Sequence, residues 1–447
     1  MDIEDIIKHL KNKVAPNEDE IFLVNTTINK VVNKLNDEIK RRNINAKVEV
    51  HGSIAHDTWL PGDRDIDVFI LFDPSVGKEK IVTEGLEIAK SAFPKYIERY
   101  AEHPFITAHV DGFLVDVVPA AMISDVSKLI TAADRTPLHS RYLSSTLNDE
   151  LKLHARILKL FMKNIGVYGA EIKVEGFSGY LVELLTVFYN GFPNFIKNAA
   201  DWIPYKTVLP KEYENVFNDP LVVIDPVDPK RNVASAVNLE NMSIVIQASR
   251  ELLKRPSLKF FIPPKPRILK KSLITSLRKR GSHIVVIVAN CPKVPPDILW
   301  GELKHSMKGI ARLMENYEFR VVDSTCWSDE NKIIALFYEV KELKLPKIKI
   351  VKGPPISMRD SCEQFIASHE NVWIRDSTLY AYSQRNVTDL LTLLKNKIFA
   401  ASLSRHIAEE LKRGFEIYID YQVLNLNGGL LIHAKKFIDK SLWWLKD

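Results

Sequence analysis

The chain contains 447 residues, more than one hydrophobic core usually serves, so we expect two to four domains. With 46% hydrophobic and 26% charged residues, it has the composition of an ordinary globular protein and not of a disordered chain. Its net charge of +6 favours an anionic partner, although many basic proteins bind no nucleic acid.

Cysteine usage and hydropathy argue against a secreted or membrane protein. Cys291, Cys326 and Cys362 are too scattered for a disulfide framework or a metal-ligand pair. The acidic start of the chain is no signal peptide, and no apolar run is long enough to span a membrane. We therefore expect a cytoplasmic protein.

In chain order, the first 135 residues combine amphipathic helices with strands. Apolar periodicity predicts helices over residues 3–13 and 18–42. Runs of branched and aromatic residues predict four strands, at 48–52, 65–71, 106–110 and 113–118. This order indicates an α/β catalytic domain over residues 1–135.

The rest of the chain divides into a helical and a mixed region. Residues 136–255 are mainly helical in pattern, most clearly at 148–165 and 177–189. Residues 256–447 combine strands with helices. The predicted strands are 284–289, 319–323, 332–340 and 415–421, and the predicted helices are 297–315 and 387–410. The predicted fold class is α+β and multidomain, with domains at 1–135, 136–255 and 256–447.

The strand at 65–71 carries two carboxylates. Side chains two apart in a strand point the same way, so Asp65 and Asp67 share one face. Ile66 and Val68 are then expected to face the core. Such carboxylates repel each other unless a hard divalent cation such as Mg²⁺ binds them, together with phosphate. An isolated Asp-x-Asp is more often a pair of solubilising charges at a strand edge, so the interpretation depends on its neighbours.

Two neighbouring segments favour a metal-dependent nucleotidyl-transfer site. Upstream, Gly52 and Ser53 form a small-residue turn in which a phosphate can approach the backbone closely. Downstream, Asp111-Gly112 is a strong hairpin signal between two β-forming runs. The second strand of this hairpin places Asp116 alone among branched apolar residues, where a charge is costly unless it is paired or bound to metal. Asp116 is therefore the expected third ligand.

Several motifs in these segments occur together in one known family. They are Gly52-Ser53, Thr58–Gly62 before Asp65–Phe69, Val115–Pro119, Asp134–His139, Gly166–Glu171, Gly176–Leu181 and Asp228–Ala234. With them the chain resembles an archaeal-type (class I) CCA-adding enzyme, a tRNA nucleotidyltransferase of the DNA polymerase β-like superfamily. The later sequence is compatible with this resemblance, with a weaker match at Lys352-Gly353-Pro354.

The resemblance implies a fold, an activity and a set of site residues. The fold would be a palm-like mixed sheet with helices, a helical central domain holding the nucleotide and base pocket, and an α/β C-terminal region that binds tRNA. The activity would be template-independent addition of C, C and A to the 3′ end of tRNA from CTP and ATP. It would proceed by two-metal nucleotidyl transfer, with Mg²⁺ as cofactor and release of pyrophosphate. The implied catalytic and metal-binding residues are Asp65, Asp67 and Asp116. The implied nucleotide-binding residues are Gly52, Ser53, His56, His139, Lys159, Tyr168 and Arg231.

Several of these residues have plainer interpretations without the resemblance. His139 would be a loop histidine, Tyr168 a core or turn aromatic, and Arg231 a surface partner of Asp228. In the family, the arginine helps to select C or A together with the tRNA backbone, and Asp228 is a candidate partner for it in reading the base.

Basic residues gather in two places. One stripe at helical spacing, in the helix at 148–165, consists of Lys152, Arg156, Lys159 and Lys163. Such a stripe is usually a solvated helix face, but it can also grip phosphates. A second group has no acidic residue between its ends. It is a candidate for contact with the tRNA backbone, or it is a solvated linker. It consists of Lys254, Arg255, Lys259, Lys265, Arg267, Lys270, Lys271, Arg278, Lys279 and Arg280.

The chain departs from the family pattern at the phosphate site and at one carboxylate. His56 stands where the family usually has arginine, and Asp57 follows it in place of glycine. A neutral imidazole offers one donor where arginine offers five, so we expect nucleotide binding to be weaker or pH-dependent. Asp65 replaces the glutamate that is common in archaeal relatives, which shortens the arm but keeps the carboxylate.

Three other functions stay open at this point. A poly(A) polymerase or oligoadenylate synthetase-like enzyme would use the same carboxylates. A small-molecule nucleotidyltransferase would need no large basic surface, and a catalytically silent RNA-binding protein would bind tRNA without consuming nucleotide. The sequence does not decide how addition stops, or whether the protein forms a homodimer.

Overall fold

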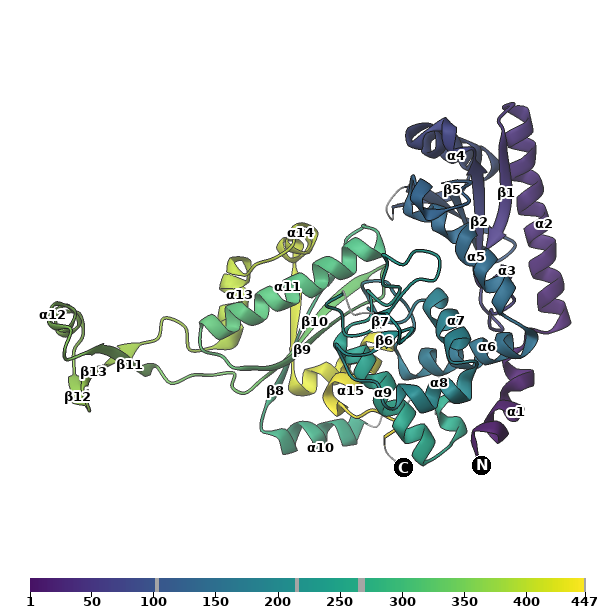
Figure 1. Cartoon of the computed structure of the whole chain (residues 1–447). Helices are drawn as coiled ribbons and strands as arrows, with labels where there is room; N and C mark the ends of the chain where they lie inside the picture. Colours follow the sequence, from purple (N-terminus) through teal and green to yellow (C-terminus); the bar gives the residue numbers. More distant parts are fainter. Residues whose placement is uncertain (101–103, 214–216, 264–269, 446–447) are drawn as a thin grey trace. The chain divides into compact units, whose positions relative to one another are not determined.

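The computed structural model describes residues 1–447 except 101–103, 214–216, 264–269 and 446–447. The chain forms two compact units, and each is described by itself. The first comprises Met1–Pro264 with Leu442–Asp447, and the second comprises Lys265–Ser441. Figure 1 labels the helices and strands along the chain. Among the described residues, no helix combines the length and apolarity needed to cross a membrane.

The first unit begins with a five-stranded mixed sheet. Its strands are β1 (Ala46–His51), β2 (Asp65–Phe72), β3 (Tyr96–Tyr100), β4 (Pro104–Val110) and β5 (Phe113–Ala121). Their order is β1-β2-β5-β4-β3, in which β2 and β5 run parallel and the other neighbours antiparallel. The predicted hairpin is confirmed, since Val110 pairs with Phe113 across Asp111-Gly112 and both turn residues have positive φ.

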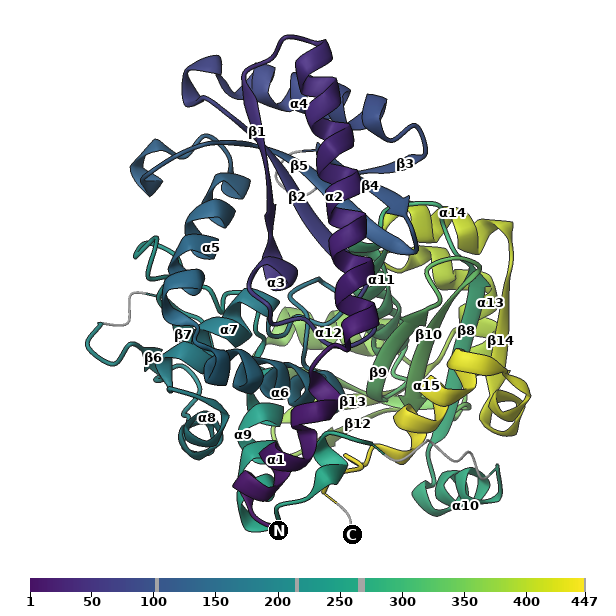
Figure 2. The ribbon, with the colours of Figure 1, turned by 90° about the vertical axis from the view of Figure 1, so that its right-hand side faces the viewer.

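Two long helices pack against this sheet (Figure 2). They are α2 (Glu18–Arg41) and α4 (Lys78–Ala92), and both bury side chains in one core with β2, β4 and β5. The preceding helix α1 (Ile3–Val14) is capped by Asp2, and α2 is capped by Asn17, which explains where each begins. The two predicted N-terminal helices are therefore confirmed, whereas α4 was not predicted.

The remainder of the first unit is mainly helical. Its elements are α5 (Arg135–Thr146), α6 (Asp149–Ile165), α7 (Gly179–Phe188), α8 (Phe192–Ala199), α9 (Leu239–Lys254) and a parallel pair, β6 (Val208–Leu209) with β7 (Val222–Val223). Helices α6, α7, α8 and α9 share a core with α1. Trp444 belongs to the same core, 1% exposed and with its ring centroid 6.1 Å from that of Phe260. Trp444 is thus a core residue.

The second unit is built on a four-stranded antiparallel sheet of order β14-β8-β10-β9. The strands are β8 (His283–Asn290), β9 (Val321–Ser328), β10 (Ile333–Val340) and β14 (Phe415–Ile419). Alternate residues of β8 enter two cores: Val285 packs with α11 (Pro296–Asn316), α13 (Leu390–Lys397) and α14 (Arg405–Arg413), and Val286 packs with α10 (Lys270–Arg280) and α15 (Gly428–Asp439). The sheet is thus covered on both faces.

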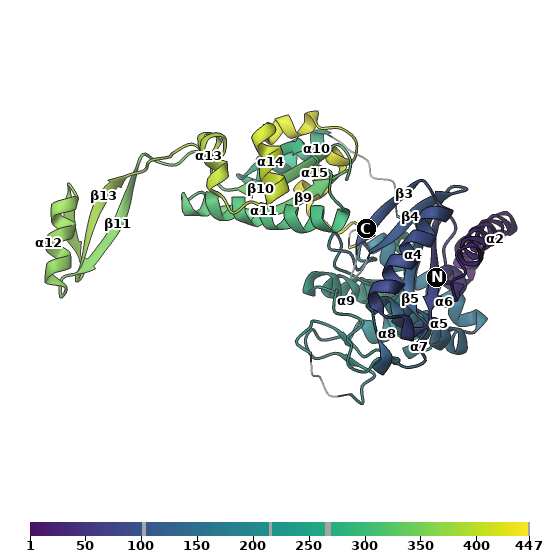
Figure 3. The ribbon, with the colours of Figure 1, turned by 90° about the horizontal axis from the view of Figure 1, so that it is seen from above.

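A smaller three-stranded antiparallel sheet lies in the same unit (Figure 3). Its order is β11-β13-β12, formed by β11 (Ile348–Pro355), β12 (Val372–Arg375) and β13 (Thr378–Gln384). Helix α12 (Arg359–Ser368) packs against it, and Phe365 lies so close to Gly353 that a side chain there would meet its ring. None of these four elements was predicted.

Two sequence predictions for the second unit are wrong in extent. The helix predicted at 387–410 is interrupted, because α13 ends in a short 3₁₀ turn (Ile398–Ala400) and α14 starts only after Ser404. The strand predicted at 319–323 begins at Val321 and continues to Ser328. At the break between the two helices tertiary packing overrides the local pattern, since the chain at Ser402 must pass against Gly309 of α11.

This close passage gives a test of the second unit. A Cβ at residue 309 would overlap the carbonyl oxygen of Ser402. We expect Gly309→Ala to destabilise the unit by about 1–3 kcal/mol because α11 and the segment at Ser402 must move apart. Thermal unfolding checks this, with Lys308→Ala, an exposed position of the same helix, as control. Equal midpoints for the two variants would contradict the close packing.

Candidate active site

Strand register brings the predicted carboxylates together. Along β2, Ile66 and Val68 are buried, with 1% and 0% exposure, and Asp65 and Asp67 alternate with them as expected. The parallel pairing of β2 with β5 aligns Asp67 directly with Asp116. The third carboxylate therefore lies on the strand next to the first two.

Burial makes this arrangement unfavourable for negative charge. Burial, and then the charges of Asp116 and Asp65, raises the pKa of Asp67 to about 7. Burial also raises the pKa of Asp116, against the effect of the Thr107 hydroxyl, which donates to Asp116 Oδ1 at 2.6 Å. The pKa of Asp65 is raised by burial and by Asp63. A positive ion would stabilise all three carboxylates.

The donor set fits a hard divalent cation, because it consists of carboxylate oxygens on adjacent strands. In the described parts of the chain, no three His, Cys, Asp or Glu side chains converge closely enough to hold an ion. Asp116 is turned towards Thr107, and Asp67 lies against Gly52. Coordination would therefore need rotation of these side chains and further oxygen ligands from substrate or water.

The predicted phosphate turn lies against the carboxylates. Strand β1 ends at His51, and Gly52 starts the one-turn helix α3 (Gly52–Ala55) with φ of 71°. A Cβ at Gly52 would overlap Asp67 Oδ2, so only glycine allows this contact. The sequence predicts that a phosphate can approach the backbone of this turn closely. In the structure, the side chain of Asp67 makes that close approach.

A cavity of about 360 Å³ opens beside the turn. The predicted site residues that line it are Gly52, Ser53, His56, Asp65, Asp67, His139 and Tyr168. The other lining residues are Asp63, Thr136, Ser140, Lys163, Gly179, Tyr180 and Glu183. The predicted residues Asp116, Lys159 and Arg231 are not among them.

His56 is bound to protein partners through both ring nitrogens. Nδ1 lies 3.0 Å from Glu183 Oε2, and Nε2 lies 2.9 Å from Ser140 Oγ. Glu183 is 3% exposed and also accepts a hydrogen bond from the Thr58 hydroxyl. His56 therefore links the turn that starts at Gly52 to α5 and α7. An arginine whose side chain is directed at a phosphate would not make this link.

The basic stripe of α6 faces the loop between α3 and β2, residues 57–63, which we call the 57–63 loop. Arg156, 7% exposed, pairs with Asp57 and donates Nε to the Trp59 carbonyl oxygen at 3.1 Å. Lys159, 1% exposed, donates Nζ to the Thr58 carbonyl oxygen at 3.0 Å. Burial lowers the pKa of Lys159. The stripe is therefore largely internal and not the solvated face that such patterns usually mark.

The two ends of the stripe are more exposed. Lys152 Nζ lies 4.0 Å from Asp57 Oδ2, and Lys163 Nζ lies 2.7 Å from Asp63 Oδ1. Lys163 also lies over the ring of Tyr168, at 5.3 Å from its centroid. Burial raises the pKa of Tyr168, which keeps its phenol neutral. Lys163 and Tyr168 form one wall of the cavity.

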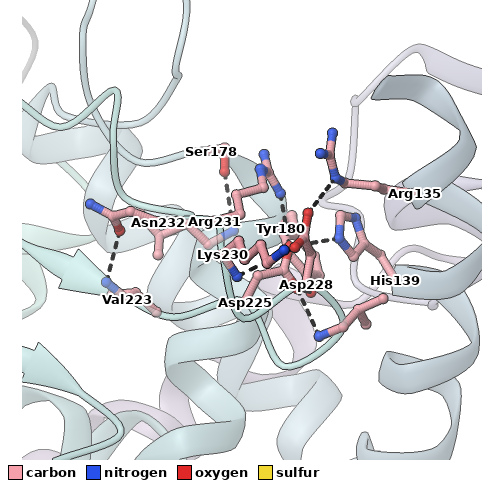
Figure 4. Close-up of polar contacts among 12 residues, drawn as sticks. Arg135, His139, Ser178, Tyr180, Val223, Asp225, Asp228, Lys230, Arg231 and Asn232 are labelled. Carbon is pink, nitrogen blue, oxygen red and sulfur yellow. Dashed lines mark hydrogen bonds and ion pairs between the residues drawn. The ribbon is translucent and has the colours of Figure 1, made fainter. Parts of the chain in front are cut away.

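Figure 4 shows the polar contacts around Asp225, a carboxylate with 0% side-chain exposure. His139 Nε2 and Arg231 Nη1 donate to its Oδ2 at 2.8 and 3.0 Å. The Tyr180 hydroxyl and the Val227 amide donate to its Oδ1 at 3.1 and 3.0 Å. One buried carboxylate thus fixes side chains from α5, α7 and the 225–231 turn.

The residues bonded to Asp225 line two different cavities. The rings of His139 and Tyr180 stack with centroids 4.0 Å apart, and both line the carboxylate cavity. Arg231 lines a second cavity of about 820 Å³, together with Lys230 and Asn232. Asp225 therefore holds one residue of each cavity wall through the same oxygen.

The interpretation of Arg231 as a side-chain partner of Asp228 is wrong. The Asp228 carboxylate pairs instead with Arg135 Nε at 2.9 Å, and Arg231 meets Asp228 only through its backbone amide. The reason is the turn itself, which folds back so that the Arg231 side chain reaches Asp225.

Sequence reasoning did not identify Asp225, Glu183, Ser140 or Tyr180. The sequence contains an indication of Glu183, because it is the one charged residue in the apolar helix α7. Asp225 had a similar one, since it follows the apolar run Leu221–Ile224. Ser140 and Tyr180 had none, because their contacts come from distant segments.

The contacts of Asp225 predict a pH-dependent contribution to stability. Burial alone would raise its pKa, but His139, the Val227 amide and Arg231 together lower it to about 2, below the ordinary value of 3.8. Its stabilising contribution is therefore complete above about pH 4 and is lost as the pH falls towards 2, because the unfolded chain takes up the proton first. We expect Asp225→Asn to cost about 2 kcal/mol at neutral pH.

Urea unfolding of both proteins between pH 7 and pH 3 measures this. The difference between wild type and variant should be constant down to about pH 4 and then narrow. A difference that widens with acid would contradict the assigned contacts.

Models of known protein families match most of the chain. The nucleotidyltransferase domain matches residues 32–139, which include α3, β2 and β5. The second domain of tRNA nucleotidyltransferase matches residues 154–262, and the C-terminal domain of the CCA-adding enzyme matches residues 280–420. The three matches follow one another in the order of the chain.

Curated archaeal proteins are similar over nearly the full length. The CCA-adding enzyme of Pyrobaculum islandicum is 38% identical over 400 residues, which cover 88% of this chain and 93% of that protein. The CCA-adding enzyme of Methanothermobacter thermautotrophicus is 35% identical over 426 residues, 93% of each chain. That of Methanocaldococcus jannaschii is 36% identical over 411 residues, 88% of this chain and 90% of that protein. The resemblance inferred from the carboxylates and their neighbouring motifs is confirmed: this chain belongs to the CCA-adding enzyme family of nucleotidyltransferases.

Proposed function

We propose that the protein adds C, C and A to the 3′ end of tRNA from CTP and ATP, without a nucleic acid template. The observation that carries this proposal is the alignment of Asp65, Asp67 and Asp116 on adjacent strands beside the Gly52 turn, in a chain that matches CCA-adding enzymes along nearly its whole length. The same carboxylates alone would also serve a poly(A) polymerase, but the similarity of the C-terminal part, residues 280–420, favours the CCA reaction.

In the proposed reaction, the 3′ oxygen of tRNA attacks the α-phosphorus of the nucleotide. A new phosphodiester bond forms, the bond to the β-phosphate oxygen breaks, pyrophosphate leaves, and the hydroxyl proton passes to solvent. We propose that Asp65, Asp67 and Asp116 hold Mg²⁺, which supplies charge neutralisation and Lewis acidity when bound. The aspartates are suited to this role because the strands fix their spacing.

The remaining cavity residues would bind and orient the nucleotide. Ser53 offers a hydroxyl beside the carboxylates, and the neutral phenol of Tyr168 can donate to a phosphate oxygen. We propose that His139 and Arg231, both held by Asp225, contact the nucleotide and its base. Fixed donors of this kind lower the cost of reaching the transition state, because they need not reorganise.

We propose that basic residues 254–280 contact the tRNA backbone. Of this group, Lys265 and Arg267 lie outside the described residues, as do the side chains of Lys270 and Lys271. Arg278 contacts the Tyr421 hydroxyl at 2.8 Å, and Arg280 lies 3.5 Å from the buried Glu339. Arg280 is therefore partly committed to the protein, and phosphate contacts by the others would make binding weaken steeply with salt.

The direct test supplies the purified protein and Mg²⁺ with a tRNA transcript that lacks its 3′ CCA. We expect two additions with CTP alone and a third when ATP is also present, read as product lengths on a sequencing gel. An open-ended ladder with ATP would show poly(A) synthesis instead, and extension of no RNA would contradict the proposal.

Variants of the site carboxylates should lose catalytic activity without losing thermal stability. We expect Asp67→Ala or Asp116→Ala to lower incorporation by more than about 100-fold while tRNA binding stays nearly intact. Because Asp67 is half-buried beside like charges that raise its pKa, its removal should leave the thermal midpoint unchanged or raise it. Mg²⁺ should raise the midpoint of the wild type and not that of the variant.

Asp125→Ala, an exposed aspartate outside the cavity, is the matched control. Normal incorporation by either carboxylate variant would overturn the assignment of the site.

A further inference from the structure

Lys163 stands apart from the rest of the basic stripe on α6. Lys152, Arg156 and Lys159 reach Asp57 or the backbone oxygens of the 57–63 loop. Lys159 is 1% exposed and does not line the carboxylate cavity, whereas Lys163 lines it with 36% side-chain exposure. The stripe therefore combines a structural part and one cavity-lining cation.

The charge of the cavity gives Lys163 a specific importance. Its described lining contains four carboxylates, Asp63, Asp65, Asp67 and Glu183, and Lys163 is the single lysine or arginine in that lining. A triphosphate brought here needs positive charge in addition to any divalent ion, since its oxygens must exchange water for charged donors. His56 does not supply it, because both of its ring nitrogens have protein partners.

Lys163 is also held in place for such a contact. Its Nζ lies 2.7 Å from Asp63 Oδ1 and 5.3 Å from the centroid of the Tyr168 ring, and both neighbours line the cavity. The other oxygen of Asp63 accepts the Leu60 amide at 3.0 Å, which fixes the carboxylate in the 57–63 loop. The ammonium group is thus directed at the cavity by a fixed acceptor and an aromatic ring.

We propose that Lys163 binds the polyphosphate group of the incoming nucleotide, exchanging the carboxylate of Asp63 for phosphate oxygens when the nucleotide enters. This inference rests on the proposed function for the identity of the nucleotide. It requires only that a nucleoside triphosphate binds in the carboxylate cavity, so it can fail or hold independently of the RNA that is extended.

Equilibrium binding to the full-length protein in Mg²⁺, without tRNA, tests the proposal. The probes are CTP, inorganic pyrophosphate and CMP. We expect Lys163→Met to weaken CTP and pyrophosphate about 10-fold or more, and CMP less than about 3-fold, because CMP lacks the terminal phosphates. Lys163→Arg should restore most of the loss, since the charge and donors return. Lys197→Met, an exposed lysine of α8, should bind all three probes as the wild type does.

Steady-state extension adds a second readout. The KM for CTP and for ATP should rise by the same factor in Lys163→Met, because the polyphosphate is common to both nucleotides, while kcat changes less. Unchanged binding of CTP and pyrophosphate, or an equal loss for CMP, would overturn the proposal.

A second variant keeps the test valid if Lys163→Met folds poorly. Asp63→Asn retains an acceptor for the Leu60 amide but removes the charge that competes for Lys163. CTP should then bind at least as tightly as to the wild type, and weaker binding would overturn the proposal. If the wild type extends tRNA while Lys163→Met binds CTP normally, only this inference fails, and the proposed function stands.

Discussion

The parallel pairing of β2 with β5 is the contact on which the site depends. It sets Asp67 beside Asp116, both half-buried, and desolvation and like charge raise the pKa of Asp67 to about 7. Such a pair gives little to folding stability, but it creates a place for positive charge. The surrounding core of β2, β4, β5, α2 and α4 holds the strands in register despite this cost.

Two other buried carboxylates hold the segments around the site together. The Glu183 carboxylate hydrogen-bonds His56 and accepts a hydrogen bond from the Thr58 hydroxyl. These contacts anchor the chain directly after α3. Asp225 receives His139, Tyr180 and Arg231, which fixes the opposite wall. Each carboxylate is satisfied by several donors, so these contacts stabilise the folded state, in contrast to the carboxylates of the sheet.

The departure at His56 has a structural consequence within this framework. The imidazole takes part in an internal network with Ser140 and Glu183 and leaves phosphate binding to other residues. Asp57, at positive φ, meets Arg156 and Lys152 of α6. His56 and Asp57 thus both bind protein partners, and the proposed source of positive charge for a triphosphate is Lys163 together with any bound ion.

Local pattern alone determined the elements that carry the chemistry. The alternation in Asp65–Phe72, the Asp111-Gly112 hairpin and the long amphipathic helices were readable, because strand and helix periods are short-range properties. The solitary charge of Asp116 in an apolar strand likewise pointed to a buried carboxylate. The motifs around these residues indicated the family, but not which side chains meet.

Tertiary structure decided the rest, for one physical reason: the contacts join segments that are far apart in sequence. Arg231 pairs with Asp225 and not with Asp228 because the turn folds back, and Lys159 lies under the 57–63 loop because α6 packs there. The same holds for the break between α13 and α14, where Gly309 admits the chain at Ser402. Sequence spacing supplied the candidate residues, whereas packing determined which of them face the cavity and which support it from behind.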